Sequence, residues 1–141
     1  LDALKRFSRR IGIAERVEFK GWVTEEEKVK ILQQAHVFVT PSSKEGWGVT
    51  VIEANACGTP VIATNVPGLR DAVRDGETGF LVPHGDIRSL ARRIIEVLKN
   101  PDLRNQMSMK SVEWARKFNW DDSARAFLQV ITEVVAGQSG K

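Results

Sequence analysis

The residues of this chain whose types and spacing could do chemistry gather in one stretch, residues 42–65, which reads SSKEGWGVTVIEANACGTPVIATN. Two glycines flank Trp47, and an apolar run at residues 37–39 precedes them. Residues 49–57 are mostly small and are followed by Gly58, which is typical of a short helix and its end. A glycine loop that opens a helix presents backbone N–H groups and the positive end of the helix dipole to one point. This arrangement suits a phosphate or a diphosphate.

Two carboxylates bracket this point, Glu45 before the loop and Glu53 within the predicted helix. A helix that begins near Val49 places Glu53 ~6 Å along its axis, because each residue adds about 1.5 Å. Its side chain leans back toward the helix N-terminus. The spacing therefore predicts a nucleoside diphosphate site, with Glu53 on the ribose hydroxyls and Glu45 on the group beyond the second phosphate.

Each of these residues also has a purely structural interpretation. Gly46 and Gly48 could simply permit a turn with positive φ. Glu53 lies among small and apolar residues, where an ionised group needs a partner, and a structural arginine could supply it. Trp47 could shield the diphosphate and sugar, or it could only pack the loop. A lysine just before such a loop, as Lys44 is, binds phosphate no more often than it simply faces solvent.

The same stretch resembles a known family. Glu45 and Glu53 are separated by seven residues and followed by ANACGTPVIA, which is similar to the E-x7-E signature of retaining glycosyltransferases of family 4, whose fold is called GT-B. The likeness continues through VPGLRDAV, DGETGFLVP and GD and covers nearly the whole chain. Its specificity is high because several spaced motifs agree in order.

The resemblance implies a retaining glycosyltransferase that moves a hexose from a nucleoside-diphosphate sugar to an acceptor hydroxyl, in polysaccharide or glycolipid biosynthesis. This chain would supply the donor site, as the C-terminal, donor-binding domain without its first strands. The acceptor domain, which would bind a glycan or a lipid-linked acceptor, is expected upstream. The basic pair that the family places on the donor diphosphate is expected there too, and no residue of this chain inherits its role. No cofactor, metal ion or nucleic acid is expected.

The resemblance also implies roles for individual residues. Glu45 would be the catalytic carboxylate and hold the donor sugar, and Glu53 would bind the ribose. The donor sugar and diphosphate are expected at Gly46, Trp47, Gly48, Val49 and Thr50. Trp22 and Val23 are candidates for contact with the base, although for Trp22 packing at the rim is the preferred interpretation.

Two rival functions stay open. Another GT-B enzyme, a phosphorylase or a sugar-nucleotide epimerase, is one alternative, and the E-x7-E spacing disfavours the epimerase. A non-catalytic nucleotide-binding or assembly module is the other. An upstream acceptor domain that ends in a basic pair would support an enzyme, and its absence from the complete gene would support a module.

Composition sets the outer bounds. The 141 residues are 42% hydrophobic and 28% charged, as in one globular domain. The net charge of +3 comes from interspersed charges and predicts no nucleic-acid surface. No apolar run approaches the ~20 residues of a spanning helix, and a lone Cys57 is consistent with a reducing compartment. We expect a cytoplasmic protein, with peripheral attachment to the inner face of the membrane as an open alternative. His36 and His84 lack the spacing of a metal site.

Periodicity predicts strands that alternate with helices. Strands are expected at residues 17–19, 36–40, 60–63 and 79–82. Helices are expected before Gly12, from Thr24, at 49–57 and at 69–74, and three more follow: one from Asp86 to before Pro101, one through residues 103–118 and one through residues 124–135. The fold class is therefore α/β, a Rossmann-like, doubly wound parallel sheet with flanking helices, forming part of the C-terminal half of a GT-B fold. Residues 1–136 are expected to form the domain and residues 137–141 a flexible tail. Because the first strands would be missing, the isolated chain is expected to be poorly stable and inactive.

Overall fold

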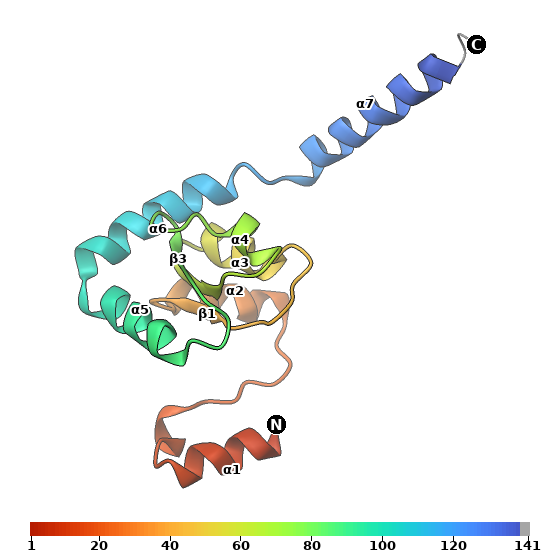
Figure 1. Cartoon of the computed structure of the whole chain (residues 1–141). Helices are drawn as coiled ribbons and strands as arrows, with labels where there is room; N and C mark the ends of the chain where they lie inside the picture. Colours follow the sequence, from red (N-terminus) through yellow and green to blue (C-terminus); the bar gives the residue numbers. More distant parts are fainter. Residues whose placement is uncertain (139–141) are drawn as a thin grey trace.

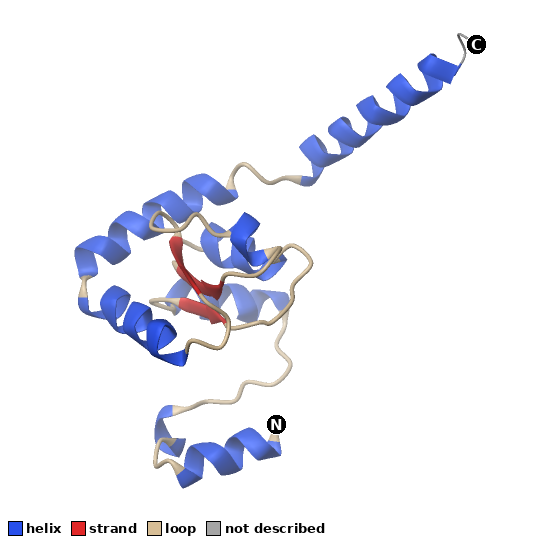
Figure 2. Cartoon of the chain, viewed as in Figure 1, coloured by secondary structure: helices blue, strands red, loops and turns tan. Residues whose placement is uncertain are grey.

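A three-stranded parallel sheet lies at the centre of the computed structural model, which describes residues 1–138 (Figures 1 and 2). The strands are β1 (Phe38–Thr40), β2 (Val61–Thr64) and β3 (Gly79–Val82), in the order β1-β2-β3. Every residue of β2 is buried, as expected for a strand covered on both faces. The predicted α/β fold class is confirmed, and so are the strands predicted at residues 36–40, 60–63 and 79–82, within two residues at each end.

Alternation along β2 builds one hydrophobic core on each face of the sheet. Val61 and Ala63 pack against α2 (Glu25–Gln34), α3 (Val49–Ala56) and α4 (Leu69–Ala72). Ile62 points to the other face, toward α5 (Ile87–Lys99) and α6 (Pro101–Ala115). Successive strand residues face opposite sides of a sheet. A strand with consecutive apolar residues therefore needs a layer of helices on each face.

Side-chain caps set where the flanking helices begin. Thr24 and Glu27 form a capping box at the start of α2. The Asp86 carboxylate accepts from the Ser89 N–H at 3.0 Å, and this bond holds the pKa of Asp86 below its usual value. Asn100 caps α6 through the Leu103 N–H at 3.0 Å. These bonds satisfy N–H groups that the first helical turn leaves free.

The N-terminal part of the chain differs from the sequence-based expectation. Helix α1 (Asp2–Arg10) and a 3₁₀ turn, η1 (Ala14–Arg16), lead into an extended segment. The strand predicted at residues 17–19 is wrong: these residues are extended but pair with no strand of the described chain. A segment with strand-like alternation, such as Val17-Glu18-Phe19, forms a strand only where a neighbour supplies a ladder of hydrogen bonds.

Several apolar residues of the N-terminal helices are exposed. Leu4, Phe7 and Ile11 of the first helical segment and Val29 of α2 are exposed, and Leu32 is the buried apolar residue of α2. Helix α7 (Trp120–Gln138) extends away from the sheet (Figure 1). It continues to Gln138, one residue past the position at which the tail was expected to begin. Residues 139–141 lie outside the described residues.

Candidate functional site

The carboxyl ends of the three strands meet at one rim. The Thr64 hydroxyl at the end of β2 donates to the carbonyl of Ser42, just after β1. Pro41, Thr64 and His84 line a hollow of about 140 Å³ there, together with the end of β3. The start of the loop after β1 and the corner at residues 82–84 therefore share one rim. Parallel α/β sheets bind ligands at this edge.

The glycine loop ends in a helix N-terminus with free donors. Gly48 is the N-cap of α3 and has a φ of 74°, the left-handed conformation that glycine favours, whereas Gly46 does not have positive φ. No side chain caps α3. Within the described chain, the N–H groups of Val49 and Thr50 find no acceptor, while that of Val51 donates to the Gly48 carbonyl at 2.9 Å. This end of α3 therefore offers unpaired donors and a positive dipole to an anion.

Helix α4 supports this loop from behind. A Cβ atom on Gly68, which precedes α4, would lie 2.5 Å from the Glu45 carbonyl oxygen and 2.7 Å from that of Gly46. A Cβ atom on Gly48 would meet the side chains of Leu69 and Ala72 at 3.2 and 3.3 Å. The short α4 therefore fixes both ends of the glycine loop by close packing.

Glu53 is half-buried on α3 and has an ionic partner. Its Oε1 lies 2.9 Å from the Lys28 Nζ of α2, which also lies 2.7 Å from the Glu25 Oε2. The two carboxylates hold the pKa of Lys28 above its ordinary value, with Glu25 the larger cause. The structural arginine considered as a partner for Glu53 is thus replaced by a lysine. The second oxygen of Glu53, Oε2, accepts no hydrogen bond from the described residues.

Glu45 is half-buried at the start of the loop, and its carboxylate makes no hydrogen bond or ion pair with the described part of the chain. Its main chain is fixed by the contact with Gly68 described above. A carboxylate without a partner in a positioned loop can accept hydrogen bonds from a polyhydroxylated ligand.

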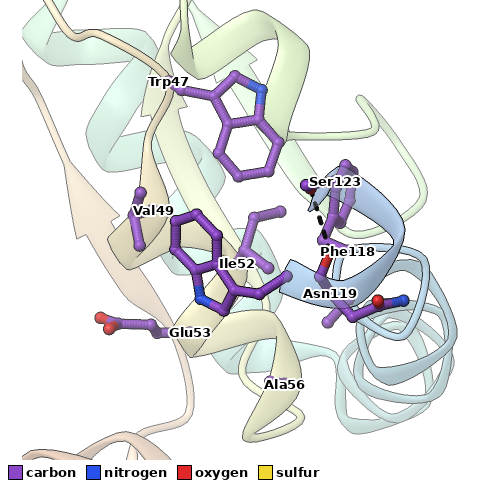
Figure 3. Close-up of a pocket in the computed structure, with 10 residues that line it drawn as sticks. Trp47, Val49, Ile52, Glu53, Ala56, Phe118, Asn119 and Ser123 are labelled. Carbon is purple, nitrogen blue, oxygen red and sulfur yellow. Dashed lines mark hydrogen bonds between the residues drawn. The ribbon is translucent and has the colours of Figure 1, made fainter. Parts of the chain in front are cut away.

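Trp47 packs edge-on against Phe118, with ring centroids 4.9 Å apart and planes at 68° (Figure 3). Phe118 in turn contacts Trp114 at 4.8 Å, and the Trp114 indole N–H donates to the Ala72 carbonyl at 2.8 Å. This chain of aromatic contacts joins the glycine loop to the end of α6 and to α4. Trp47 therefore packs the loop, while its half-exposed ring leaves a ligand contact open.

A cavity of about 430 Å³ lies between α3 and the beginning of α7 (Figure 3). Trp47, Val49 and Glu53 of the predicted site line one side, and Phe118 and Asn119 line the other. The cavity brings together three of the predicted residues, while Glu45, Gly46, Gly48 and Thr50 lie outside its lining.

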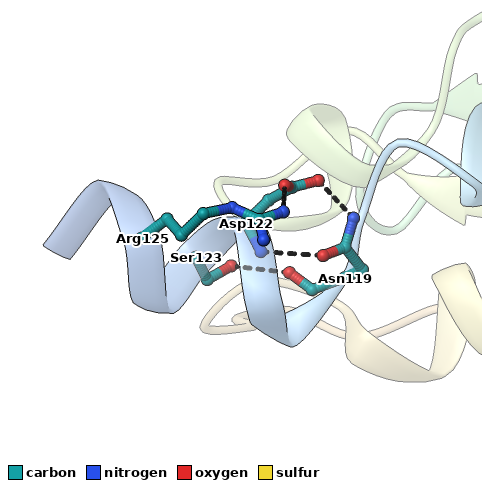
Figure 4. A network of polar contacts seen from close by, with 4 residues as sticks. All are labelled: Asn119, Asp122, Ser123 and Arg125. Carbon is teal, nitrogen blue, oxygen red and sulfur yellow. Dashed lines mark hydrogen bonds and ion pairs between the residues drawn. The ribbon is translucent and has the colours of Figure 1, made fainter. Parts of the chain in front are cut away.

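Asn119 also begins α7 through a network of polar contacts (Figure 4). Its Oδ1 accepts from the Asp122 N–H at 2.8 Å, its Nδ2 donates to the Asp122 carboxylate, and its carbonyl accepts from the Ser123 hydroxyl at 3.1 Å. Arg125 pairs with Asp122 and, as the main cause, holds the pKa of that carboxyl below its usual value. The network orders the cavity wall at the point where α7 leaves the domain.

A family model described as "Glycosyl transferases group 1" matches residues 1–114. The chain belongs to this family. Among curated relatives, it is 41% identical over 131 residues to the D-inositol 3-phosphate glycosyltransferase of Streptomyces scabiei, covering 93% of the chain and 29% of that protein. It is 33% identical to the phosphatidyl-myo-inositol mannosyltransferase of Mycobacterium leprae, covering 91% of the chain and 34% of that protein. The chain spans about a third of the length of these relatives.

Solved structures show the same fold. The sucrose-phosphate synthase of Thermosynechococcus elongatus aligns with a TM-score of 0.87 at 34% identity, covering 95% of the chain and 34% of that protein. The Anabaena protein HepE, solved in complex with UDP, aligns with a TM-score of 0.86 at 22% identity, over 94% of the chain and 36% of that protein. The group 1 chain therefore has a Rossmann-like fold that forms part of a GT-B architecture.

The residues predicted to contact the base stand apart from the rest of the site. In this group 1 chain, Trp22 is 87% exposed, and Val23 is half-buried in the segment that leads into α2. Neither residue lines the cavity beside Glu53. The rim packing preferred for Trp22 is not seen, because so exposed an indole covers little surface.

Three residues of the site escaped the sequence reasoning. Lys28 partners Glu53 across 25 positions, Gly68 backs the glycine loop, and Phe118 holds Trp47. No spacing rule in the sequence links Phe118 or Gly68 to the loop. The one indication in the sequence was Glu53 itself, because an ionised group among small and apolar residues needs a partner.

Within the described residues, no group of three or more His, Cys, Asp and Glu side chains could hold a metal ion, and no helix is long and apolar enough to cross a membrane. Burial raises the pKa of the Cys57 thiol above its usual value.

Proposed function

We propose that this chain is the C-terminal, donor-binding part of a retaining glycosyltransferase of family 4, which moves a hexose from a nucleoside-diphosphate sugar to an acceptor hydroxyl. The observation that carries the proposal is the pairing of a half-buried carboxylate, Glu53, with free N–H groups one helical turn away at Val49 and Thr50. A ribose diphosphate spans such a pair of groups. HepE was solved with UDP and with UDP-glucose, which supports this class of ligand.

The chemistry of the site fits the departure of a nucleoside diphosphate. Negative charge develops on the β-phosphate as the sugar leaves, and the N-terminus of α3 stabilises that charge without a proton transfer. Glu45 accepts hydrogen bonds from the sugar, with the N–H groups of Gly46, Trp47 and Gly48 beside it. Val49 and Thr50 hold the diphosphate, and Glu53 holds the ribose. The acceptor, a glycan or a lipid-linked molecule, binds a domain outside this chain.

The predictions about cofactors, location and membrane attachment are unchanged. Metal-free and cofactor-free catalysis, cytoplasmic location and peripheral membrane attachment stay predictions of the sequence. A phosphorylase remains the rival within the enzyme class, and the named relatives, a D-inositol 3-phosphate glycosyltransferase and a phosphatidyl-myo-inositol mannosyltransferase, favour transfer to an acceptor hydroxyl.

Calorimetry on the complete enzyme tests the ribose assignment. Glu53→Ala is expected to weaken binding of the preferred nucleoside diphosphate, from a panel of UDP, ADP and GDP, by about 1 to 3 kcal/mol, the range for hydrogen bonds to a charged acceptor. Glu113→Ala, an exposed glutamate of α6, is the matched control and should leave affinity unchanged. Unchanged affinity in a folded Glu53→Ala variant would contradict the proposal.

A further inference from the structure

We propose that Lys28 is a positioning residue that aims the Glu53 carboxylate at the ribose of the bound nucleotide. The inference rests on the function proposed above, because it presupposes that Glu53 binds the ribose. Lys28 belongs to α2, a helix with no predicted role in the site. Its contact with one oxygen of Glu53 leaves the other oxygen available to the ligand.

The position of Lys28 is fixed by the start of its helix. The capping box of Thr24 and Glu27 orders the first turn of α2, and the Lys28 N–H donates to the Thr24 carbonyl at 2.9 Å. The side chain then reaches α3, where its Nζ lies 2.9 Å from the Glu53 Oε1. The cap of one helix thereby determines where the carboxylate of the next helix lies.

The two contacts of Lys28 differ in burial. The side chains of Lys28 and Glu53 are 29% and 35% exposed, whereas that of Glu25 is 81% exposed. An exposed ion pair is screened by water, and a partly shielded one holds its geometry better. The contact of Lys28 with Glu53 is therefore the better defined of the two, and it restricts the orientation of the Glu53 carboxylate. The contact with Glu25 lies on the solvent side of the same ammonium group.

A lysine leaves the carboxylate usable. An ammonium is a compact donor that binds one oxygen here, while an arginine presents a planar fork that matches both oxygens of a carboxylate. The Glu53 Oε2 accepts no hydrogen bond from the described residues, and an ionised carboxylate has about four acceptor positions. Oε2, held by the contact at Oε1, can accept from ribose hydroxyls without a break in the ion pair.

The competing explanation is that Lys28 only fastens α2 to α3. A purely structural role would change the stability of the domain and affect every nucleotide alike. A positioning role depends on the ribose hydroxyls, so it vanishes with a nucleotide that lacks them. Comparison of each nucleotide with its dideoxy counterpart separates the two explanations.

The experiment measures the dissociation constants of UDP, ADP and GDP and of their 2′,3′-dideoxy counterparts on the complete enzyme. Lys28→Met is expected to weaken the best-bound ribonucleotide roughly tenfold, as for a lost charge-assisted contact, and to leave its dideoxy counterpart unchanged. Lys30→Met, an exposed lysine of the same helix, is the control and should change neither. In a Glu53→Ala background, Lys28→Met should have no further effect.

The outcomes separate this inference from the proposed function. If Lys28→Met weakened the ribonucleotide and its dideoxy counterpart equally, or weakened neither, the positioning role of Lys28 would be overturned. The ribose assignment would still hold if Glu53→Ala weakened only the ribonucleotide. If Glu53→Ala itself failed to distinguish the two nucleotides, the ribose assignment would be wrong and the inference would be overturned with it.

Discussion

Gly68 lies directly against the backbone carbonyl of Glu45, at a distance that excludes any side chain. A Cβ atom on Gly68 would sit 2.5 Å from that oxygen, closer than real Cβ atoms approach a carbonyl. The φ of Gly68 is 84°, which also favours glycine. The catalytic carboxylate predicted from the sequence is thus carried by a loop whose position depends on a glycine 23 residues later in the chain.

We expect Gly68→Ala to displace the loop at Glu45 and Gly46 and to lower the rate of sugar transfer by the complete enzyme roughly 10- to 100-fold, because small misplacements of reacting groups are costly. Gly76→Ala is the matched control: Gly76 has a similar φ of 76°, but a Cβ atom there meets nothing within 4 Å. Steady-state kinetics of both variants give the comparison. Equal rates in the two variants would show that loop position does not depend on Gly68.

Glu45→Gln should impair sugar transfer far more than binding of the bare nucleoside diphosphate. The reason is that the Glu45 carboxylate has no partner among the described residues, so its hydrogen bonds are expected to belong to the donor sugar. The turnover number and the calorimetric affinity for UDP, ADP or GDP are measured on the same preparation. Parallel losses in both quantities would indicate that Glu45 holds the loop in place instead.

Asn55→Leu should stabilise the protein. Asn55 is fully buried on α3, and neither its amide nitrogen nor its amide oxygen has a hydrogen-bond partner in the described chain. Removal of unsatisfied buried polar groups is expected to raise the free energy of unfolding by about 1 to 3 kcal/mol. The midpoint of urea unfolding checks this, with Asn105→Leu on the exposed side of α6 as a control that should change little. A lower midpoint for Asn55→Leu would mean that the amide is satisfied, for instance by ordered water.

The isolated chain of 141 residues should transfer no sugar and should self-associate, with a weakly cooperative melt. Helix α7 exposes Phe127, Leu128 and Ile131, and Phe127 alone is 68% exposed. Contiguous apolar surface of this kind promotes association. Sedimentation and thermal melts test this, and the double substitution Phe127→Glu with Ile131→Lys should reduce association without altering the sheet. A monodisperse chain with a sharp, reversible transition and sugar transfer would contradict the prediction.

The sequence alone determined the features that depend on neighbours in the chain. The glycine loop after β1, the helix that carries Glu53, the capping box at Thr24 and the cap at Asp86 follow from local hydrogen bonds and periodicity. The order of strand, loop and helix also placed the loop at the carboxyl edge of the sheet, because parallel strands share that edge.

Only the tertiary structure decided which distant residues meet. Residues 17–19 carry a strand-like apolar pattern but form no strand, because pairing requires a neighbour that the local sequence does not specify. The contacts of Lys28 with Glu53, of Gly68 with Glu45 and of Phe118 with Trp47 join residues 23 to 71 positions apart. Their partners are set by how the helices pack on the sheet, and no periodicity within one element encodes that packing.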